Sequence, residues 1–212
     1  ETATFTYLMG GGIGITPMIA FAHRLHDLGR PFALHYSVRT AADAAFAADL
    51  DQIPWRGRVE VHISDQGSRA DLEQILRYSQ GAHVYVCGPD RYIASVIDTA
   101  TANGFPEPAR HLEYFSAPEV EARPSLPFTL RLRYGREVSV PADQNGAEAL
   151  LDAGVHVDLK CSDGICGVCK CGVRSGAVDH RDHVLSNAQR ETSMILCQSR
   201  AAEDGGVIEI DL

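Results

Sequence analysis

Four cysteines in the last part of the chain have a spacing suited to holding iron. Three follow the pattern C-x4-C-x2-C and a fourth lies further along the chain: Cys161, Cys166, Cys169 and Cys197. Iron in a sulfide cluster requires soft, anionic thiolate ligands, and this spacing is one that binds a 2Fe-2S cluster. The sequence therefore predicts a metal site that carries single electrons.

The residues around these cysteines suit the same chemistry. Gly164 and Gly167 lie between the ligands and, without a Cβ, can adopt the positive φ angles that turn backbone N–H groups toward the sulfurs. The apolar residues at positions 194–196 precede Cys197 and can bring that thiolate in on another strand. We expect the loop to close around the cluster from both sides.

Other uses of the cysteines fit less well. Structural zinc usually takes its ligands as two close pairs, whereas here a triplet faces one lone cysteine. Six cysteines in 212 residues, with no signal-peptide pattern, do not indicate a disulfide scaffold. Cys171 forms a C-x-C pair with Cys169 and could exchange with it as a ligand, although we favour an ordinary thiol on the following strand.

The composition sets broad limits. A chain of 212 residues with 45% hydrophobic content favours two domains. The net charge of -9 and the pI near 5.4 argue against a nucleic-acid partner. An acidic electron carrier would suit a partner with a basic docking face, but an ordinary acidic protein explains the charge equally well. No apolar run has the length of a membrane span, so we expect a cytoplasmic protein with no membrane partner.

Residues 1–116 alternate short apolar runs with amphipathic stretches. We predict strands at residues 5–9, 32–38, 59–63, 83–87 and 111–115. We predict helices at residues 16–28, 43–50, 70–78 and 90–103. This order predicts an α/β domain with a doubly wound parallel sheet that binds a nucleotide.

Residues 117–126 show neither the helical nor the strand periodicity of apolar residues, so we predict a linker there. It contains Pro118, Pro124, Glu119 and Glu121. The remaining residues, 127–212, predict a small α+β domain. Its predicted elements are a hairpin of strands 128–134 and 137–140, a helix at about 146–153 and a final strand at 207–210.

A glycine-rich turn follows the first predicted strand. Gly11, Gly12 and Gly14 precede Thr16 and Pro17, at the start of a predicted helix. A helix N-terminus reached through a turn without side chains can bind a pyrophosphate, with Thr16 as a cap and Pro17 in the first helical turn. The spacing is not G-x-G-x-x-G, so a purely structural turn stays open.

A second turn, Cys87-Gly88-Pro89, ends another predicted strand. Ligands of a doubly wound sheet lie beyond the carboxyl ends of its strands, so the two turns should flank one crevice. Cys87 by itself is as consistent with a buried small hydrophobic residue. After the second strand, an acidic residue would bind the ribose 2'-hydroxyl of NADH, and a basic residue would bind the 2'-phosphate of NADPH. This chain has Arg39 there, so NADPH stays possible beside NADH. The alternative interpretation is that Arg39 is a solvated surface residue.

These motifs, in this order, resemble those of the phthalate dioxygenase reductase family of oxygenase reductases. The resemblance includes the run Gly-Gly-Ile-Gly-Ile-Thr-Pro-Met, Val-Cys-Gly-Pro, His111 to Phe115, the cysteine loop, residues 175–182 and residues 197–201. It implies an FMN barrel, then an NAD domain, then a ferredoxin domain of β-grasp fold. It also implies NADH as the donor.

The resemblance also implies roles for individual residues. The glycine turn with Thr16 and Pro17 would lie at the pyrophosphate and nicotinamide, with Cys87 and Gly88 near the nicotinamide ring. We also count Pro89, in the turn with these two residues, among the nucleotide-binding residues. Phe115 would lie close to the flavin. Glu113 would orient the nicotinamide or the flavin edge, or would be an ordinary strand-end carboxylate. We expect no catalytic acid or base.

One part of the family pattern is missing. The flavin motif Arg-x-Tyr-Ser is not found, because Arg77-Tyr78-Ser79 lacks the intervening residue, and the chain starts directly with the first strand. We expect an upstream FMN domain to have been removed. A similar three-module reductase also occurs fused behind a cytochrome P450.

The predicted function is an oxidoreductase that passes electrons from NAD(P)H through FMN to a 2Fe-2S cluster and on to a terminal oxygenase or P450. Nicotinamide gives two electrons as hydride and the cluster takes one, so without FMN we expect little activity from this chain. A 2Fe-2S electron carrier without catalysis and a zinc-bearing module are the alternatives.

Overall fold

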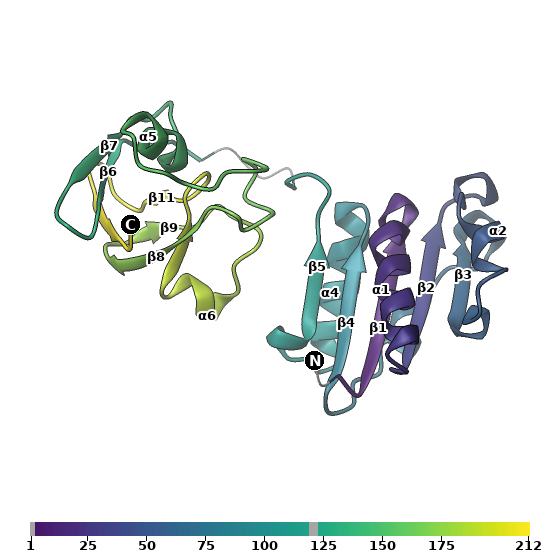
Figure 1. Ribbon diagram of the computed structural model, residues 1–212. Helices are drawn as coiled ribbons and strands as arrows, with labels where there is room; N and C mark the ends of the chain where they lie inside the picture. Colours follow the sequence, from purple (N-terminus) through teal and green to yellow (C-terminus); the bar gives the residue numbers. More distant parts are fainter. Residues whose placement is uncertain (1–2, 119–122) are drawn as a thin grey trace. The chain divides into compact units, whose positions relative to one another are not determined.

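The computed structural model describes residues 3–118 and 123–212. The chain divides into two compact units at the boundary between Phe115 and Ser116, each with its own sheet and core (Figure 1). The linker prediction falls partly on residues 119–122, which lie outside the described residues.

The first unit is built on a five-stranded parallel sheet with the strand order β3-β2-β1-β4-β5. Its strands are β1 (Phe5–Gly11), β2 (Phe32–Val38), β3 (Val59–Ile63), β4 (Ala82–Cys87) and β5 (Arg110–Glu113). Its longer helices are α1 (Ile15–Asp27) and α4 (Asp90–Ala102). Besides two short helices described below, its described residues contain 3-10 turns at Gly12–Gly14, Ala41–Asp43, Arg56–Arg58, Ser64–Gln66 and Glu107–Ala109. The predicted doubly wound fold is confirmed.

Neighbouring residues of the central strand face opposite sides of this sheet. Leu8 packs in a core with Ile15 and Met18 of α1, whereas Met9 packs in a second core with Ile93 and other residues of α4. Both faces of a parallel sheet are buried by helices, so its strands are apolar on both sides. This explains why β1 is almost continuously hydrophobic.

The predicted helix at residues 43–50 is wrong in its first half. Thr40 and Asp43 form a reciprocal cap, in which each backbone N–H is bound by the side chain of the other, and this closes a 3-10 turn. Ala44 then leaves the helical region with ψ at 57°. The helix α2 forms only at Ala47–Leu50.

The predicted helix at residues 70–78 is also too long, because α3 covers only Leu72–Ile75. Asp71 caps its start by accepting a hydrogen bond from Gln74 N. The next residue, Leu76, turns to ψ 82°, its side chain is buried, and its carbonyl accepts a 2.6 Å hydrogen bond from Asn103 Nδ2. A contact with the end of α4 has replaced the next turn of the helix.

The second unit contains a five-stranded mixed sheet in the order β10-β8-β12-β6-β7 and a two-stranded sheet of β11 and β9. Its strands are β6 (Phe128–Arg131), β7 (Glu137–Val140), β8 (Lys170–Ser175), β9 (Val178–Asp179), β10 (Ser193–Ile195), β11 (Arg200–Ala201) and β12 (Val207–Ile210). Its helices are α5 (Gly146–Asp152) and α6 (Asn187–Arg190). The predicted small α+β fold is confirmed.

Inward side chains of this sheet and α5 form a single core. Phe128 and Leu130 of β6 and Ile208 and Ile210 of β12 are buried against Leu150 of α5. The alternation of buried and exposed residues along β6, β7 and β12 is typical of a sheet with one covered face. Among the described residues, no helix is long and apolar enough to cross a membrane.

Candidate functional site

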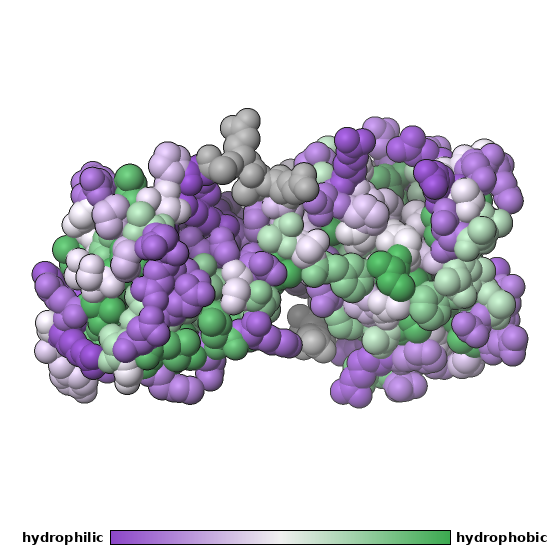
Figure 2. Space-filling view, turned by 90° about the horizontal axis from the view of Figure 1, so that it is seen from above, coloured by the Kyte–Doolittle hydropathy of each residue, from purple (hydrophilic) through white to green (hydrophobic). Residues whose placement is uncertain are grey.

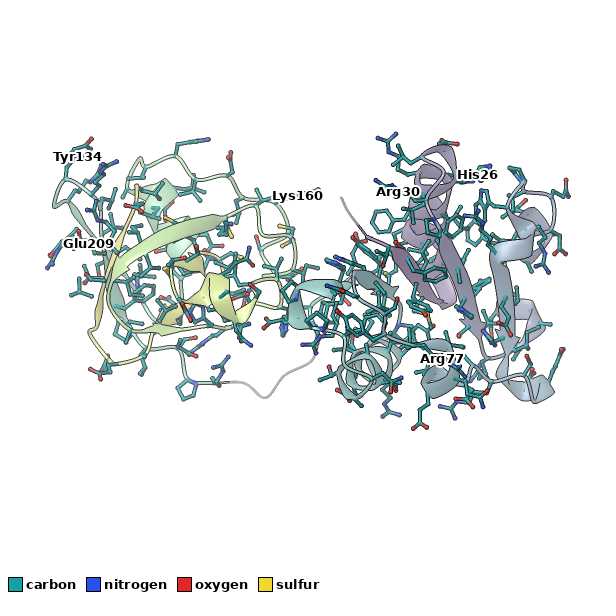
Figure 3. All side chains as sticks on the ribbon, turned by 90° about the horizontal axis from the view of Figure 1, so that it is seen from below. His26, Arg30, Arg77, Tyr134, Lys160 and Glu209 are labelled. Atoms are coloured by element: carbon teal, nitrogen blue, oxygen red, sulfur yellow. The ribbon has the colours of Figure 1, made fainter. Side chains whose placement is uncertain are left out.

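The cysteine loop lies between α5 and β8, and Lys160, labelled in Figure 3, marks where it starts. Strand β8 begins directly after Cys169 and pairs antiparallel with β10. One further backbone bond, from Leu196 N–H to the Cys169 carbonyl at 3.2 Å, extends this pairing toward the loop. It brings Cys197 beside Cys169, as the apolar run before Cys197 predicted.

The side-chain hydrogen bonds among the four thiols form two pairs. Burial works against ionisation of Cys161, but hydrogen bonds from Cys166 and from loop N–H groups lower its pKa to about 7. The hydrogen bond between Cys169 and Cys197 is the main cause that lowers the pKa of Cys169 to about 6, and it raises the pKa of Cys197. Each pair can hold one iron as a thiolate ligand pair.

This pairing distinguishes a two-iron cluster from a single zinc ion. Four sulfurs about 2.3 Å from one zinc lie roughly 3.8 Å from one another in a tetrahedron. Within residues 3–118 and 123–212, no three of the cysteine sulfurs lie within 4.8 Å of one another. The donor set fits a 2Fe-2S cluster, in which each iron takes two of the four thiolates.

The loop backbone is shaped for this site. Gly164 and Gly167 both have φ at 71°, as their position between the ligands predicted. Asp163 N–H donates to Cys161 Sγ at 3.4 Å. The hydrogen bond with Cys169 and burial raise the pKa of Cys197, and a hydrogen bond from the Gly164 backbone opposes that rise. Amide groups aimed at sulfur stabilise the thiolate form that binds iron.

Two residues that support the loop were not found from the sequence. Gln198 Nε2 donates a 2.7 Å hydrogen bond to the Ser162 carbonyl, and Ser162 has a positive φ of 60°. Neither residue type is a metal ligand, and only the proximity of Gln198 to Cys197 pointed to it. Cys171 belongs to neither thiol pair; it is buried in β8 opposite Met194.

The first unit has a cavity of about 790 Å³ at the carboxyl ends of β1, β2 and β3. Figure 2 views this end of the sheet, where hydrophilic and hydrophobic residues are mixed on the surface. Four of the predicted nucleotide-site residues line the cavity: Gly11, Gly12, Arg39 and Pro89. The cavity is therefore formed by both predicted turns and the end of β2.

Other predicted residues hold the two turns against each other. A Cβ on Gly14 would lie 2.2 Å from the Cys87 carbonyl oxygen, and a Cβ on Gly88 would lie 2.9 Å from the Gly11 Cα. These glycines lie outside the cavity lining and allow the two backbones to touch. Thr16 does not cap α1, because its Oγ1 donates to the Ile13 carbonyl and the cap position is Gly14. Pro17 lies in the first turn of α1, as predicted.

The remaining predicted residues lie at the ends of β4 and β5. Cys87 is fully buried in the core shared with α1, opposite Glu113 in the sheet. Burial, followed by the Glu113 charge, raises the pKa of Cys87 to about 11, so its thiol stays protonated at neutral pH. Phe115 lies beyond β5 and is 57% exposed, because this strand ends at Glu113 rather than at residue 115.

The cavity has further polar residues that sequence patterns did not indicate. The buried hydroxyls of Ser37 and Tyr92 lie close to each other and line it, together with Arg69 and Arg91. Tyr92 lies against the glycine turn, since a Cβ on Gly11 would lie 2.7 Å from its ring. Ser37 belongs to β2, Arg69 lies before α3, and Arg91 and Tyr92 are neighbours at the start of α4, so no single local motif joins all four.

Comparison with known proteins covers both units. Residues 131–202 match the 2Fe-2S iron-sulfur cluster binding domain. The whole chain resembles phthalate dioxygenase reductase of Burkholderia cepacia, with 38% identity over 208 residues, 96% of this chain and 64% of that protein. The chain belongs to the phthalate dioxygenase reductase family. The phenoxybenzoate dioxygenase subunit beta of Ectopseudomonas oleovorans is 40% identical over 211 residues, again 96% and 64% of the two chains.

Solved structures agree with the fold. Full-length CYP116B46 from Tepidiphilus thermophilus matches all of this chain with 28% of its own, at 36% identity and a TM-score of 0.82. The structure of phthalate dioxygenase reductase, described as modular for electron transfer from pyridine nucleotides to [2Fe-2S], matches all of this chain with 66% of its own, at 36% identity and a TM-score of 0.59. The present chain spans about 64% of the length of its reductase relatives.

Proposed function

We propose that this chain is the nucleotide-binding and cluster-binding part of an NAD(P)H-dependent oxygenase reductase. The observation that carries the proposal is the arrangement of Cys161 with Cys166 and of Cys169 with Cys197 as two thiol pairs in a loop lined by amides. The cavity beside the glycine turn of the first unit is the proposed binding site of the nucleotide.

The four cysteines would hold the two irons of the cluster, which would supply one-electron chemistry when bound. The loop N–H groups stabilise the thiolates. The bond from Gln198 to Ser162 keeps the fourth ligand close to the loop. The protein contributes position and electrostatics at this end, and no side-chain acid or base is required.

In the first unit, the glycine turn and the N-terminus of α1 bind the pyrophosphate of the nucleotide. Tyr92 and Ser37 are hydrogen-bonding groups in the same cavity. We propose NADH as the donor. NADPH is the second candidate, because Arg39, Arg69 and Arg91 all line the cavity and a guanidinium binds a 2'-phosphate well.

A flavin is part of the proposal. Nicotinamide delivers two electrons as hydride, whereas a 2Fe-2S cluster takes one, so FMN on a separate domain would connect them. The final acceptor would be a terminal oxygenase or a cytochrome P450, as a separate protein or in one polypeptide. We place the protein in the cytoplasm, where reducing conditions keep the four proposed ligand cysteines reduced and available for iron.

Reconstitution with iron and sulfide under anaerobic conditions tests the cluster. We expect two irons and two sulfides per chain, a brown colour and an electron paramagnetic resonance signal after reduction with dithionite. Zinc-only binding or a colourless product would contradict the proposal.

Stopped-flow mixing with NADH tests the electron path. Cluster bleaching should be slow with the chain alone and much faster when a flavin-loaded reductase domain is added. Rapid bleaching without any flavin would refute the proposed role of FMN.

Nucleotide affinity measured by Trp55 fluorescence tests the cavity. Arg39→Gln should weaken NADPH at least tenfold if Arg39 faces the 2'-phosphate, while NADH affinity changes little. Equal weakening of both nucleotides would assign Arg39 to the pyrophosphate instead. Arg133→Gln, in the other unit, is the control and should change neither.

A further inference from the structure

Two histidines and a glutamate come together on neighbouring strands of the first unit. His35 of β2 lies opposite Glu60 of β3, and His62 lies two residues further along β3. His35 Nδ1 is 3.1 Å from His62 Nε2 and 3.6 Å from Glu60 Oε2. One ligand atom from each residue lies within 4.8 Å of the other two.

These separations suit a metal ion. Imidazole nitrogens and carboxylate oxygens bind zinc at about 2.0 to 2.2 Å, which places neighbouring ligand atoms roughly 3.3 to 3.5 Å apart in a tetrahedral site. The distance between His35 Nδ1 and His62 Nε2, 3.1 Å, is slightly shorter than this range, and the distance between His35 Nδ1 and Glu60 Oε2, 3.6 Å, is slightly longer. Two imidazoles and one carboxylate also form a known three-ligand set for zinc that leaves a fourth position open.

Burial and protonation favour the same use. Both imidazoles are buried, whereas the Glu60 side chain is 65% exposed and free to adjust. Burial first, and then the neighbouring His62, lowers the pKa of His35 to about 4, and burial also lowers the pKa of His62. Both rings are therefore neutral at pH 7, the form that binds a metal.

A second histidine pair in the same sheet lacks the carboxylate. His83 of β4 and His111 of β5 have Nδ1 and Nε2 2.9 Å apart and are stacked like His35 and His62. In the part of the chain that the structure describes, His35, Glu60 and His62 are the one group of three possible metal ligands within this distance. The pair His83 and His111 has similar geometry without a carboxylate, so it serves as a control for metal binding by the first pair.

We propose that His35, Glu60 and His62 bind a divalent transition-metal ion such as Zn²⁺. The ion would join β3, which is the edge strand of the sheet, to β2. His62 also lines the nucleotide cavity, so the metal site would share a wall with that cavity. Because a metal bound only by the folded state stabilises it, the first unit would become more resistant to unfolding.

The test uses the full chain with its iron cluster loaded and titrates Zn²⁺ by calorimetry. We expect one Zn²⁺ per chain in addition to the irons, and a higher midpoint of thermal unfolding reported by Trp55. Glu60→Gln and His62→Gln should each weaken Zn²⁺ at least tenfold. Since Glu60 is exposed, Glu60→Gln should fold normally, and its melting temperature without metal serves as the check.

The matched control is His111→Gln, which breaks the second pair and should leave Zn²⁺ affinity unchanged. Iron is counted before and after the titration. Failure of the wild type to bind Zn²⁺ would overturn the proposal. Unchanged affinity in Glu60→Gln and His62→Gln would also overturn it, because the ion would then be held by other groups, such as the cysteines.

Discussion

Gln198 Nε2 donates a 2.7 Å hydrogen bond to the carbonyl of Ser162, and this bond joins the two segments that carry the proposed cluster ligands. Ser162 directly follows Cys161, and Gln198 directly follows Cys197. The bond therefore holds together the first and the last ligand. It also supports the backbone of Ser162, whose φ of 60° is unfavourable for a residue with a side chain.

Removing this bond should loosen the cluster. Gln198→Ala removes one hydrogen bond, worth about 1 kcal/mol, without changing a ligand. We expect a full complement of iron after reconstitution but a several-fold faster loss of visible absorption in the presence of a chelator. Gln52→Ala, at an exposed position in the first unit, is the control. Equal rates for the two variants would contradict the role of Gln198.

Gly164→Ala should be more damaging than an alanine at another left-handed glycine. Its Cβ would lie 2.7 Å from Gln198 Cγ and 3.2 Å from the Asp182 Cα, with φ at 71°. Gly135→Ala meets open space at a φ of 82° and so measures the backbone strain alone, about 1 kcal/mol. We expect lower iron content only in Gly164→Ala. Similar iron content in both variants would show that the loop adapts.

Cys171 should be dispensable for iron. It packs opposite Met194 in the core, and burial raises its thiol pKa, which disfavours the thiolate that iron needs. Cys171→Ala should keep two irons per chain, whereas Cys197→Ala should lose the cluster. Iron analysis and visible absorption measure both. Loss of iron in Cys171→Ala would mean that the wrong thiol of the C-x-C pair has been assigned.

Gly14→Ala should separate the two turns beside the nucleotide cavity. The new Cβ would lie 2.2 Å from the Cys87 carbonyl oxygen, and a backbone atom cannot move aside cheaply. We expect a loss of about 1 to 3 kcal/mol in the free energy of unfolding and at least tenfold weaker NADH binding. Trp55 fluorescence measures both. Gly57→Ala, which meets no atom within 4 Å, is the control and should bind NADH like the wild type.

Acid should destabilise the first unit through His35. Its pKa is lowered to about 4 by burial and by His62, with Glu60 opposing, so between pH 6.5 and 4 the unfolded chain binds a proton that the folded chain does not. Stability is therefore complete above pH 6.5 and falls as the pH drops toward 4, by up to about 3 kcal/mol.

Urea unfolding followed by Trp55 at several pH values measures this loss. His35→Gln should flatten the pH dependence, while His156→Gln, at an exposed position in the other unit, should leave it as it is. An equally steep pH dependence in His35→Gln would assign the acid sensitivity to another group.

The sequence alone determined the parts that are local. The proposed cluster ligands Cys161, Cys166 and Cys169 lie in one loop, and short-range geometry decides whether such a loop can hold iron. The doubly wound order of the first unit was also predictable, since its strands and its two long helices carry strong apolar patterns. Helix ends at Ala44 and Leu76 were not predictable, because a cap and a contact with Asn103 override helix propensity.

Only the tertiary structure decided which distant residues meet. Strand pairing between β8 and β10 brings Cys197 beside Cys169, and it separates the four thiols into the two pairs that distinguish two irons from one zinc. The cavity joins Tyr92 and Arg69 to the glycine turn, and sheet register places Glu60 beside His35. Such contacts depend on how whole helices and strands pack, so they cannot be predicted from the spacing of residues along the chain.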